Sequence, residues 1–530
     1  MHRILLCDPL DESGLEIFRD AGVELRQLGD VDSEREQLPE IIADFDAIVV
    51  RSRTQVTADL LRRGRNLKVV GRAGIGVDNV DIPAATDLGI LVVNAPTANL
   101  ISATEHTFAL LLALARNVPA AERSLRAGEW DRKRFIGLEL DGKTLGVVGL
   151  GRIGQAVAHR ARAFGMKVVA YDPYLDPLVA KRLEIEMAPL EAVLAVADVV
   201  TLHLPLTDET RHLISAERIA RMKPGSMLVN CARGGIVDDK ALLEALESEH
   251  LAGAALDVFE VEPPVDRRLI DHPRVVSTPH IGAQTREAQE RVATQTARMV
   301  LAALDGSLAV TAVNLPFRAA GPGGEPYLRL SEQLGRLASS LLGGSLKKLQ
   351  VDLWGVDEEL HGAVSIAAVR GVLRPFLGEA VNFVNAEKLA EDRGVEVVRA
   401  THRQAAEYSS LIGVTVTGAR GTVELAGTVF GESDLRVVRY DDYRLEFRPE
   451  GRLLVLSNRD VPGVVGRLGS LLGEAGVNIA DIHLARGSAN GEGEVNAVAV
   501  LRLDQRPAEA VLDRLRALPE VSKAQLVDLE

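Results

Sequence analysis

The sequence has few of the residues that define several common classes of protein. Only two of its 530 residues are cysteine, Cys7 and Cys231, and they have no metal-ligand spacing, so we expect neither a disulfide framework nor a metal site. No apolar run approaches the length of a membrane span. The opening stretch MHRILLCDPL is typical of a first β-strand rather than a signal peptide. Together these absences predict a cytoplasmic location.

Basic residues are also fewer than acidic ones, 61 against 75. The formal net charge of −14 argues against nucleic acid and against a membrane surface, so we expect neither as a partner. Aromatic residues make up only 4% of the chain, whereas the hydrophobic and charged fractions of 47% and 26% are ordinary for a globular protein. At about 150 residues per domain, a chain of this length predicts three or four domains.

A complete dinucleotide-binding turn is present in the first half of the chain. An apolar strand, the sequence G-x-G-x-x-G at Gly149, Gly151 and Gly154, and a helical pattern follow one another between residues 144 and 164. The glycines permit a tight turn, close approach to a pyrophosphate and close helix–strand packing, with the phosphates facing the helix N-terminus. Asp172 ends the next strand, near the roughly 20-residue offset at which a carboxylate binds the adenosine ribose. Because a carboxylate there repels a 2′-phosphate, the sequence predicts NAD rather than NADP.

The rest of the chain divides by its periodicity. Short apolar strands alternate with helical stretches over the first hundred residues, which predicts a parallel α/β unit. Proline and glycine between residues 312 and 326 predict a boundary. Residues 327–447 read as alternating helices and strands without a chemical motif, and the last eighty or so read as β-α-β-β-α-β, a ferredoxin-like module.

Three polar residues, Arg233, Glu262 and His280, follow apolar strands, where open α/β sheets place their ligands. A histidine can remove the hydroxyl proton while a hydride leaves the same carbon for nicotinamide, and a carboxylate can stabilise the resulting imidazolium. The planar fork of an arginine suits a substrate carboxylate. The set predicts oxidation of a 2-hydroxy acid, although each residue alone also fits an exposed loop. Asp257 is expected either to bind the nicotinamide half of the cofactor or to cap a turn.

A second candidate cluster, Arg51, Ser52 and Arg53, directly follows the strand DAIVV. Two arginines flanking a serine offer several donors to a phosphate, and surface charge is the alternative reading. The segment GRAGIG, which contains Arg72 and Gly74, follows another strand, and its glycines free backbone N–H groups to cradle a carboxylate.

At these motifs the chain resembles the D-isomer-specific 2-hydroxyacid dehydrogenases, and among them the long-form D-3-phosphoglycerate dehydrogenases. The matching segments span most of the chain: RSRT (51–54), GRAGIGVDNVD (71–81), GLGRIG (149–154), NCARGGIVD (230–238), DVFEVEP (257–263) and HIGAQT (280–285). The resemblance implies an α/β protein with four domains. They are a flavodoxin-like substrate domain over 1–96 and 280–316, a Rossmann NAD domain over 97–279, an α/β intervening domain over 327–447 and a ferredoxin-like ACT domain over 451–530.

The resemblance also implies roles for individual residues. The catalytic set is Arg233, Glu262 and His280. The residues implied at the cofactor are Gly149, Gly151, Arg152, Ile153, Gly154, Asp172, Cys231, Arg233, Asp257 and His280. Those implied at the substrate are Arg51, Ser52, Arg53, Arg72, Gly74 and, lent by an adjacent subunit, Arg132.

The implied reaction is oxidation of 3-phosphoglycerate to 3-phosphohydroxypyruvate with NAD, the entry to L-serine synthesis, in a homotetramer. A glyoxylate or hydroxypyruvate reductase and a non-enzymatic NAD-sensing regulator are the alternatives. The ACT domain implies L-serine as a candidate effector, with Asp460 and Asn478 as contacts. Asn458 stands where serine-responsive relatives have an aromatic residue, so inhibition by serine stays open.

Overall fold

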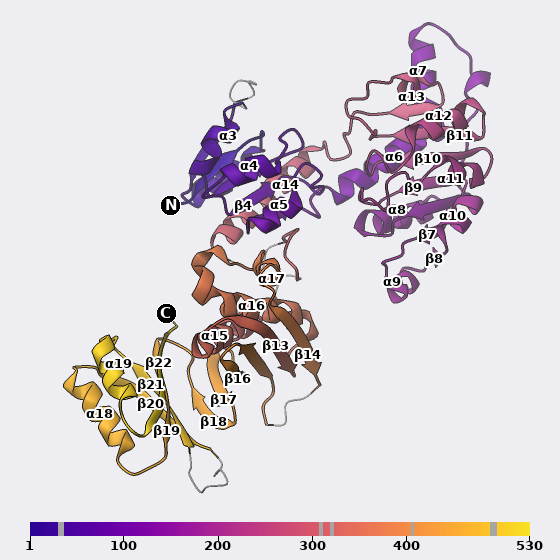
Figure 1. The fold of residues 1–530 in the computed structure, drawn as a ribbon. Coiled ribbons are helices and arrows are strands. Elements are labelled where there is room, and N and C mark those ends of the chain that lie inside the picture. The colour runs from indigo at the N-terminus through magenta and orange to yellow at the C-terminus, as the bar shows by residue number, and fades with distance from the viewer. Residues whose placement is uncertain (30–35, 307–310, 318–322, 404–406, 488–495, 530) are drawn as a thin grey trace.

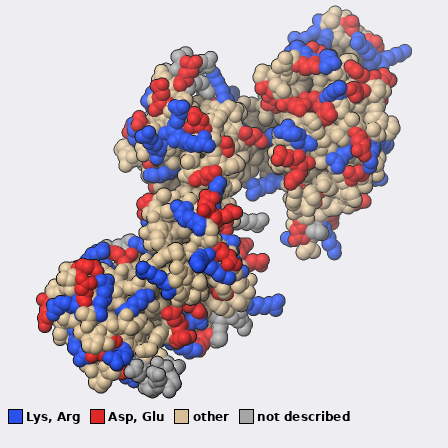
Figure 2. Space-filling model, in the orientation of Figure 1, with Lys and Arg blue, Asp and Glu red and all other residues tan. Residues whose placement is uncertain are grey.

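The computed structural model describes residues 1–29, 36–306, 311–317, 323–403, 407–487 and 496–529, which form four units in a curved row (Figure 1). The N-terminal unit lies between the second and third units, and the C-terminal unit lies at the far end. Within these ranges no helix is both long and apolar enough to cross a membrane. Basic and acidic side chains are interspersed over the face shown in Figure 2, without an extended field of one sign.

The first unit is a five-stranded parallel sheet in the order β2-β1-β3-β4-β5, the flavodoxin-like order. Its strands are β1 (Arg3–Leu6), β2 (Glu24–Gln27), β3 (Ala47–Val50), β4 (Val69–Arg72) and β5 (Leu91–Asn94). Its helices are α1 (Glu12–Asp20), α3 (Leu38–Ile41), α4 (Ala58–Arg63), α5 (Ile82–Asp87) and, from much later in the chain, α14 (Arg286–Leu304). Helix α14 belongs here because Val292, Ala297 and Val300 pack against Ile4 and Val49 of the sheet.

The second unit is a seven-stranded parallel sheet in the order β12-β11-β10-β9-β6-β7-β8, which is the Rossmann arrangement with one further strand. Its strands are β6 (Thr144–Val148), β7 (Lys167–Tyr171), β8 (Glu186–Met187), β9 (Val199–Leu202), β10 (Ser226–Asn230), β11 (Leu251–Leu256) and β12 (Val275–Ser277). Its helices are α6 (Leu100–Ala115), α7 (Val118–Arg126), α8 (Arg152–Ala163), α9 (Pro177–Arg182), α10 (Leu190–Val196), α11 (Ala216–Arg221), α12 (Asp239–Glu247) and α13 (Arg268–Asp271).

Two crossovers join the first and second units, and they are tied to each other. The chain enters the second unit through α6 and returns to α14 through the segment after β12. The hydroxyls of Ser102 and Thr285 lie 2.7 Å apart, and Arg291 Nε donates to the carbonyl of Ala98 at 2.9 Å. The domain boundaries predicted at residues 96 and 280 fall near these crossovers and stay predictions.

The third unit is a six-stranded mixed sheet in the order β14-β13-β15-β16-β17-β18, packed against two long helices. Its helices are α15 (Glu325–Leu342), α16 (His361–Leu377) and α17 (Ala386–Glu391). Its strands are β13 (Leu346–Trp354), β14 (Glu396–His402), β15 (Leu411–Gly418), β16 (Gly421–Phe430), β17 (Asp434–Tyr440) and β18 (Tyr443–Phe447). The predicted alternation of helices and strands is wrong beyond β14, because four strands follow one another there as antiparallel neighbours.

The fourth unit has the predicted β-α-β-β-α-β order, with an antiparallel sheet in the order β20-β21-β19-β22. Its elements are β19 (Arg452–Arg459), α18 (Val464–Glu474), β20 (Ile479–Arg486), β21 (Asn496–Leu503), α19 (Glu509–Arg516) and β22 (Val521–Asp528). One face of the sheet packs on its own helices, whereas Leu453, Val455 and Val500 on the other face join the core of the third unit. The third and fourth units therefore share apolar packing.

Candidate active site

The glycine-rich turn after β6 has the geometry that a pyrophosphate requires. Gly149 adopts a φ of +92°, and a Cβ there would lie 2.5 Å from the carbonyl oxygen of His203. A Cβ on Gly154 would lie 2.0 Å from the carbonyl oxygen of Gly149, so only glycine allows α8 to start this close to the strand. Gly151, at the N-cap of α8, faces open space, which leaves its backbone accessible to a ligand at the helix N-terminus. These residues fit a dinucleotide.

Asp172 lies next to this turn, immediately after β7. Its Oδ2 accepts the N–H of Leu150 at 2.9 Å and its Oδ1 accepts the N–H of Tyr174 at 2.9 Å. The carboxylate is therefore held in place by the glycine-rich turn itself. Arg152 is exposed and its Nη1 reaches the carbonyl of Pro96 at 3.4 Å, while Ile153 packs partly buried against the core.

His280 and Glu262 form a hydrogen-bonded pair. Nδ1 of His280 lies 2.7 Å from Oε2 of Glu262, whose Oε1 accepts the N–H of Phe259 at 3.1 Å. Because the carboxylate accepts from Nδ1, Nε2 is the nitrogen left to take up a proton. The hydrogen bond to Glu262 raises the pKa of His280, although partial burial opposes it. Both side chains line a cavity of about 360 Å³, together with Pro263 and Ile270.

Asp257 is almost completely buried beneath the loop that carries His280. Its carboxylate accepts hydrogen bonds from His106, Thr278 and the backbone of that loop. Burial acts to raise the pKa of Asp257, but the hydrogen bonds from His106 and Thr278 outweigh it, so the pKa lies below its ordinary value. Its predicted place beside the nicotinamide stays a prediction. Burial, reinforced by Asp257, raises the pKa of the Cys231 thiol to about 12, so this cysteine stays protonated.

Arg72 and Arg233 bring two guanidinium groups close together where the first two units meet. Nε of Arg233 lies 3.0 Å from Oδ2 of Asp78, so the two units meet here through an ion pair. Nε of Arg72 is buried without a hydrogen-bond partner among the described residues. Burial, together with the nearby charges of Arg233 and Arg51, lowers the pKa of Arg72 to about 10. Gly74 beside it adopts a φ of +153°, a conformation that favours glycine.

The predicted phosphate-binding loop is clamped at both ends. Oδ2 of Asp8 accepts the N–H of Arg51 at 2.6 Å and that of Thr54 at 3.3 Å. Nδ2 of Asn79 donates to the carbonyls of the same two residues, at 2.7 and 2.6 Å. Asp8 directly follows β1 and Asn79 lies in GVDNVD, so both positions were available from the sequence, but neither was predicted to hold this loop.

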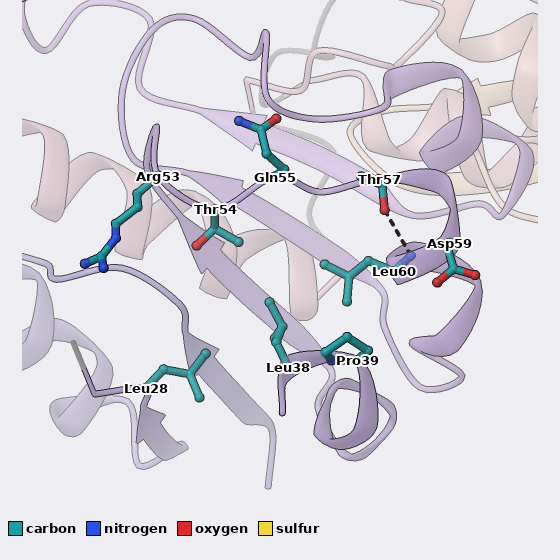
Figure 3. A pocket seen from close by; sticks show the side chains of 9 residues that line it. All are labelled: Leu28, Leu38, Pro39, Arg53, Thr54, Gln55, Thr57, Asp59 and Leu60. Carbon is teal, nitrogen blue, oxygen red and sulfur yellow. Dashed lines mark hydrogen bonds between the residues drawn. The ribbon is translucent and has the colours of Figure 1, made fainter. Parts of the chain in front are cut away.

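Arg53 faces a different space from the other predicted substrate residues. It lines a separate pocket of about 350 Å³ in the first unit (Figure 3). The other residues of this pocket are Leu28, Leu38, Pro39, Thr54, Gln55, Thr57, Asp59 and Leu60. The structure thus brings Arg51 near Arg72, whereas Arg53 lines this other pocket. Ser52 and Arg132 are both exposed.

The candidate effector residues lie at opposite ends of the fourth unit. Asp460 follows the end of β19, and its Oδ2 lies 2.7 Å from Nε of Arg486. Asn478 precedes β20, and its Nδ2 donates to Asp504 at 2.6 Å. Because β19 spans eight residues, at about 3.3 Å per residue the two positions are separated by roughly 26 Å. One module alone does not bring them to a common ligand.

Comparison with known protein families agrees with the geometry of the turn. Residues 108–282 match the D-isomer specific 2-hydroxyacid dehydrogenase NAD binding domain. Residues 325–441 match the D-3-phosphoglycerate dehydrogenase intervening domain, and residues 452–520 match the ACT domain. Fold and turn therefore define an NAD-binding 2-hydroxyacid dehydrogenase.

Full-length relatives narrow this class. The chain is 41% identical to the D-3-phosphoglycerate dehydrogenase of Bacillus subtilis over 533 residues, covering 100% of both chains. It is 42% identical to that of Mycobacterium tuberculosis over 530 residues, covering 99% of both. A crystal structure of NAD-dependent formate dehydrogenase from Staphylococcus aureus in complex with NAD superposes with a TM-score of 0.51 and 33% identity, covering 58% of this chain and 96% of the other. The chain belongs to the D-3-phosphoglycerate dehydrogenase family.

Proposed function

We propose that this protein oxidises 3-phospho-D-glycerate to 3-phosphohydroxypyruvate with NAD, the first step of L-serine biosynthesis. The observation that carries the proposal is the His280–Glu262 pair, which lies close enough to Arg233 for the charge of this arginine to act on His280. The full-length match to D-3-phosphoglycerate dehydrogenases agrees with it.

The chain's own side chains supply binding and proton transfer. Nε2 of His280 takes the proton of the C2 hydroxyl, and Glu262 stabilises the imidazolium that results. Arg233 binds the α-carboxylate and polarises the oxygen at C2, for which it must give up its ion pair with Asp78. NAD, held at Gly149–Gly154 and Asp172, supplies the acceptor for the hydride.

The phosphate is the feature that separates this substrate from other 2-hydroxy acids. Burial lowers the pKa of Arg72, and the nearby charges of Arg233 and Arg51 lower it further, although Asp78 and Asp8 oppose them. Three guanidinium groups therefore lie close together before any ligand binds. A substrate with a carboxylate at one end and a phosphate at the other relieves this repulsion. Asp8 and Asn79 fix the loop that presents Arg51.

A reductase acting on glyoxylate or hydroxypyruvate is the second candidate, because the His280, Glu262 and Arg233 set suits any small 2-hydroxy acid or its keto form. The test follows NADH formation from 3-phosphoglycerate and from D-glycerate. We expect kcat/KM to be at least about tenfold higher for 3-phosphoglycerate, since one charge-assisted contact contributes roughly 1.5–3 kcal/mol. Equal efficiencies would favour the second candidate. NAD binding without NADH formation from either substrate would favour an NAD-sensing regulator.

We also propose that the protein works in the cytoplasm as a homotetramer in which Arg132 completes the site of an adjacent subunit. Arg132 lies between two apolar residues whose side chains are exposed in the single chain. The exposed fraction is 79% for Trp130 and 81% for Ile136. Exposed apolar groups of this size favour contact with another subunit. Light scattering on the purified protein measures the assembly, and a monomer would contradict it.

We propose that L-serine binds between two ACT domains at Asp460 and Asn478. Strand β20 is an edge of its sheet and exposes Ile482 and Leu484. Two such edges related by a twofold axis run antiparallel, which brings the Asn478 end of one module beside the Asp460 end of the other. Asp460 can pair with the α-ammonium group of serine, and the Asn478 amide can hydrogen-bond either end of it.

A further inference from the structure

His106 belongs to a buried hydrogen-bond network that the reaction above does not use. It lies on α6, the crossover from the first unit to the second, and its side chain is only 15% exposed. Its Nε2 lies 3.1 Å from Oδ1 of Asp257 and 3.0 Å from Oγ1 of Thr278. An ionised carboxylate can only accept, so Nε2 carries the ring proton and donates it to Asp257.

Asp257 in turn holds the segment that carries His280. Its Oδ1 accepts the N–H of Ile281 and its Oδ2 the N–H of Gly282, both at 2.8 Å, and its backbone carbonyl accepts the N–H of His280 at 2.8 Å. A Cβ on Gly282 would lie 3.1 Å from Oδ2 of Asp257, so the segment packs directly on the carboxylate.

The backbone of His280 needs such anchoring. Its φ is +54°, in the left-handed region, which is unfavourable for a residue other than glycine. A conformation of this kind persists only when its surroundings over-determine it. The hydrogen bonds to Asp257 do so, and His106 is one of the groups that fix Asp257.

We propose that His106 is a positioning residue that acts through Asp257 to set the orientation of His280. The inference rests on the proposed function, because it assumes that His280 is the base. Since His106 is carried by α6, the contact also ties the catalytic segment to the helix that joins the two units, so that a displacement of α6 is transmitted to His280.

Two substitutions separate the hydrogen bond from the bulk of the side chain. His106→Leu removes the donor, whereas His106→Gln places an amide N–H at a reach similar to that of Nε2. We expect His106→Leu to lower kcat by about 10- to 100-fold, while KM for 3-phosphoglycerate and Kd for NAD change less than about threefold. His106→Gln should keep kcat within about threefold of wild type. His250, a part-buried histidine that bonds the carbonyl of Ile219, is the matched control, and His250→Leu should leave kcat unchanged.

The same substitution in a His280→Ala background tests whether His106 acts through the base. There His106→Leu should change the residual kcat by less than about twofold, because the side chain that it positions is gone. An equal loss in both backgrounds, or equal losses in His106→Leu and His106→Gln, would overturn the proposal.

A measurement without substrate keeps the test independent of the proposed function. The rate at which diethyl pyrocarbonate modifies His280, located by peptide mass spectrometry, should change at least about threefold in His106→Leu and stay at the wild-type value in His106→Gln, because orientation and access set this rate. An unchanged rate in His106→Leu contradicts the positioning role. Failure of the wild-type protein to oxidise 3-phosphoglycerate contradicts only the proposed function.

Discussion

The interdomain cleft and the ACT domain both carry polar residues that we assign to a small ligand, and they differ in how far one chain completes the site. In the cleft, His280 and Glu262 are bonded to each other beside a cavity, and Arg72 has a buried Nε without a partner among the described residues. In the ACT domain, Asp460 and Asn478 each bond a neighbour in their own module and lie at opposite ends of it.

The two sites should therefore differ in how much they rearrange when a ligand binds. The orientation of the cleft residues is set during folding, so little further ordering is needed when substrate binds. A ligand of the ACT domain needs a second copy of the module and must displace existing interactions. It can regulate activity only by as much as it prefers one arrangement of the subunits over another.

The largest effect should come from the base in the cleft. His280→Ala should lower kcat by roughly 10²–10⁴-fold, the range for loss of a positioned acid–base group. Kd for NAD should stay close to wild type, as measured by quenching of protein fluorescence. A loss of less than about tenfold would remove His280 from the reaction.

The next effect concerns the cofactor side of the cleft. Asp172→Arg should raise the NADP-to-NAD ratio of kcat/KM by roughly 10- to 100-fold, which corresponds to about 1.4–2.7 kcal/mol, because repulsion of the 2′-phosphate becomes attraction. Asp172→Asn is the control, since it removes the charge but keeps an acceptor for the N–H of Leu150. An unchanged ratio in Asp172→Arg would remove Asp172 from the ribose site.

The pH dependence of kcat tests the pairing of His280 with Glu262. Alcohol oxidation needs neutral His280, so kcat rises with pH through the pKa of this residue, which the hydrogen bond to Glu262 raises. Glu262→Gln removes the negative charge that stabilises the imidazolium, so the acidic limb of the profile should move to lower pH. A limb that does not move would mean that Glu262 is not the partner of His280 in the working enzyme.

The smallest effect is expected in the ACT domain. L-serine should inhibit weakly or not at all, because Asn458 replaces the aromatic side chain of responsive relatives and Asp460 must leave Arg486. Calorimetry and serine titration of activity, both on the full-length protein, separate binding from inhibition. Tight binding with full inhibition would contradict the role given to Asn458.

The sequence predicted the elements that depend on local pattern. The glycine-rich turn, the parallel strands around it and the order of the ACT elements were read from periodicity and glycine spacing, and the structure confirms them. The antiparallel run from β15 to β18 was missed, because its pairing joins residues that carry no signal of which strand is the neighbour. Helix α14 was expected to return toward the first domain, but its packing beside α1 depends on contacts nearly 300 residues apart.

The residues of the candidate site also differ in whether the sequence predicted them. Residues in the loops that follow strands, such as Glu262 and His280, could be found because parallel strands present their carboxyl ends at one edge. Asp8, Asn79 and His106 were not found, because each acts on a loop that is distant in sequence. Nothing in the pattern RSR distinguishes Arg51 from Arg53, although the structure gives them different neighbours.

Those two arginines provide the most direct test of the central claim that the cleft recognises phosphate with residues held in place by one chain. The measurement is kcat/KM for 3-phosphoglycerate relative to D-glycerate in wild type, Arg51→Gln and Arg53→Gln. We predict that Arg51→Gln lowers this ratio by at least about tenfold, mainly through KM for 3-phosphoglycerate, and that Arg53→Gln lowers it less. A ratio unchanged in Arg51→Gln would contradict the account.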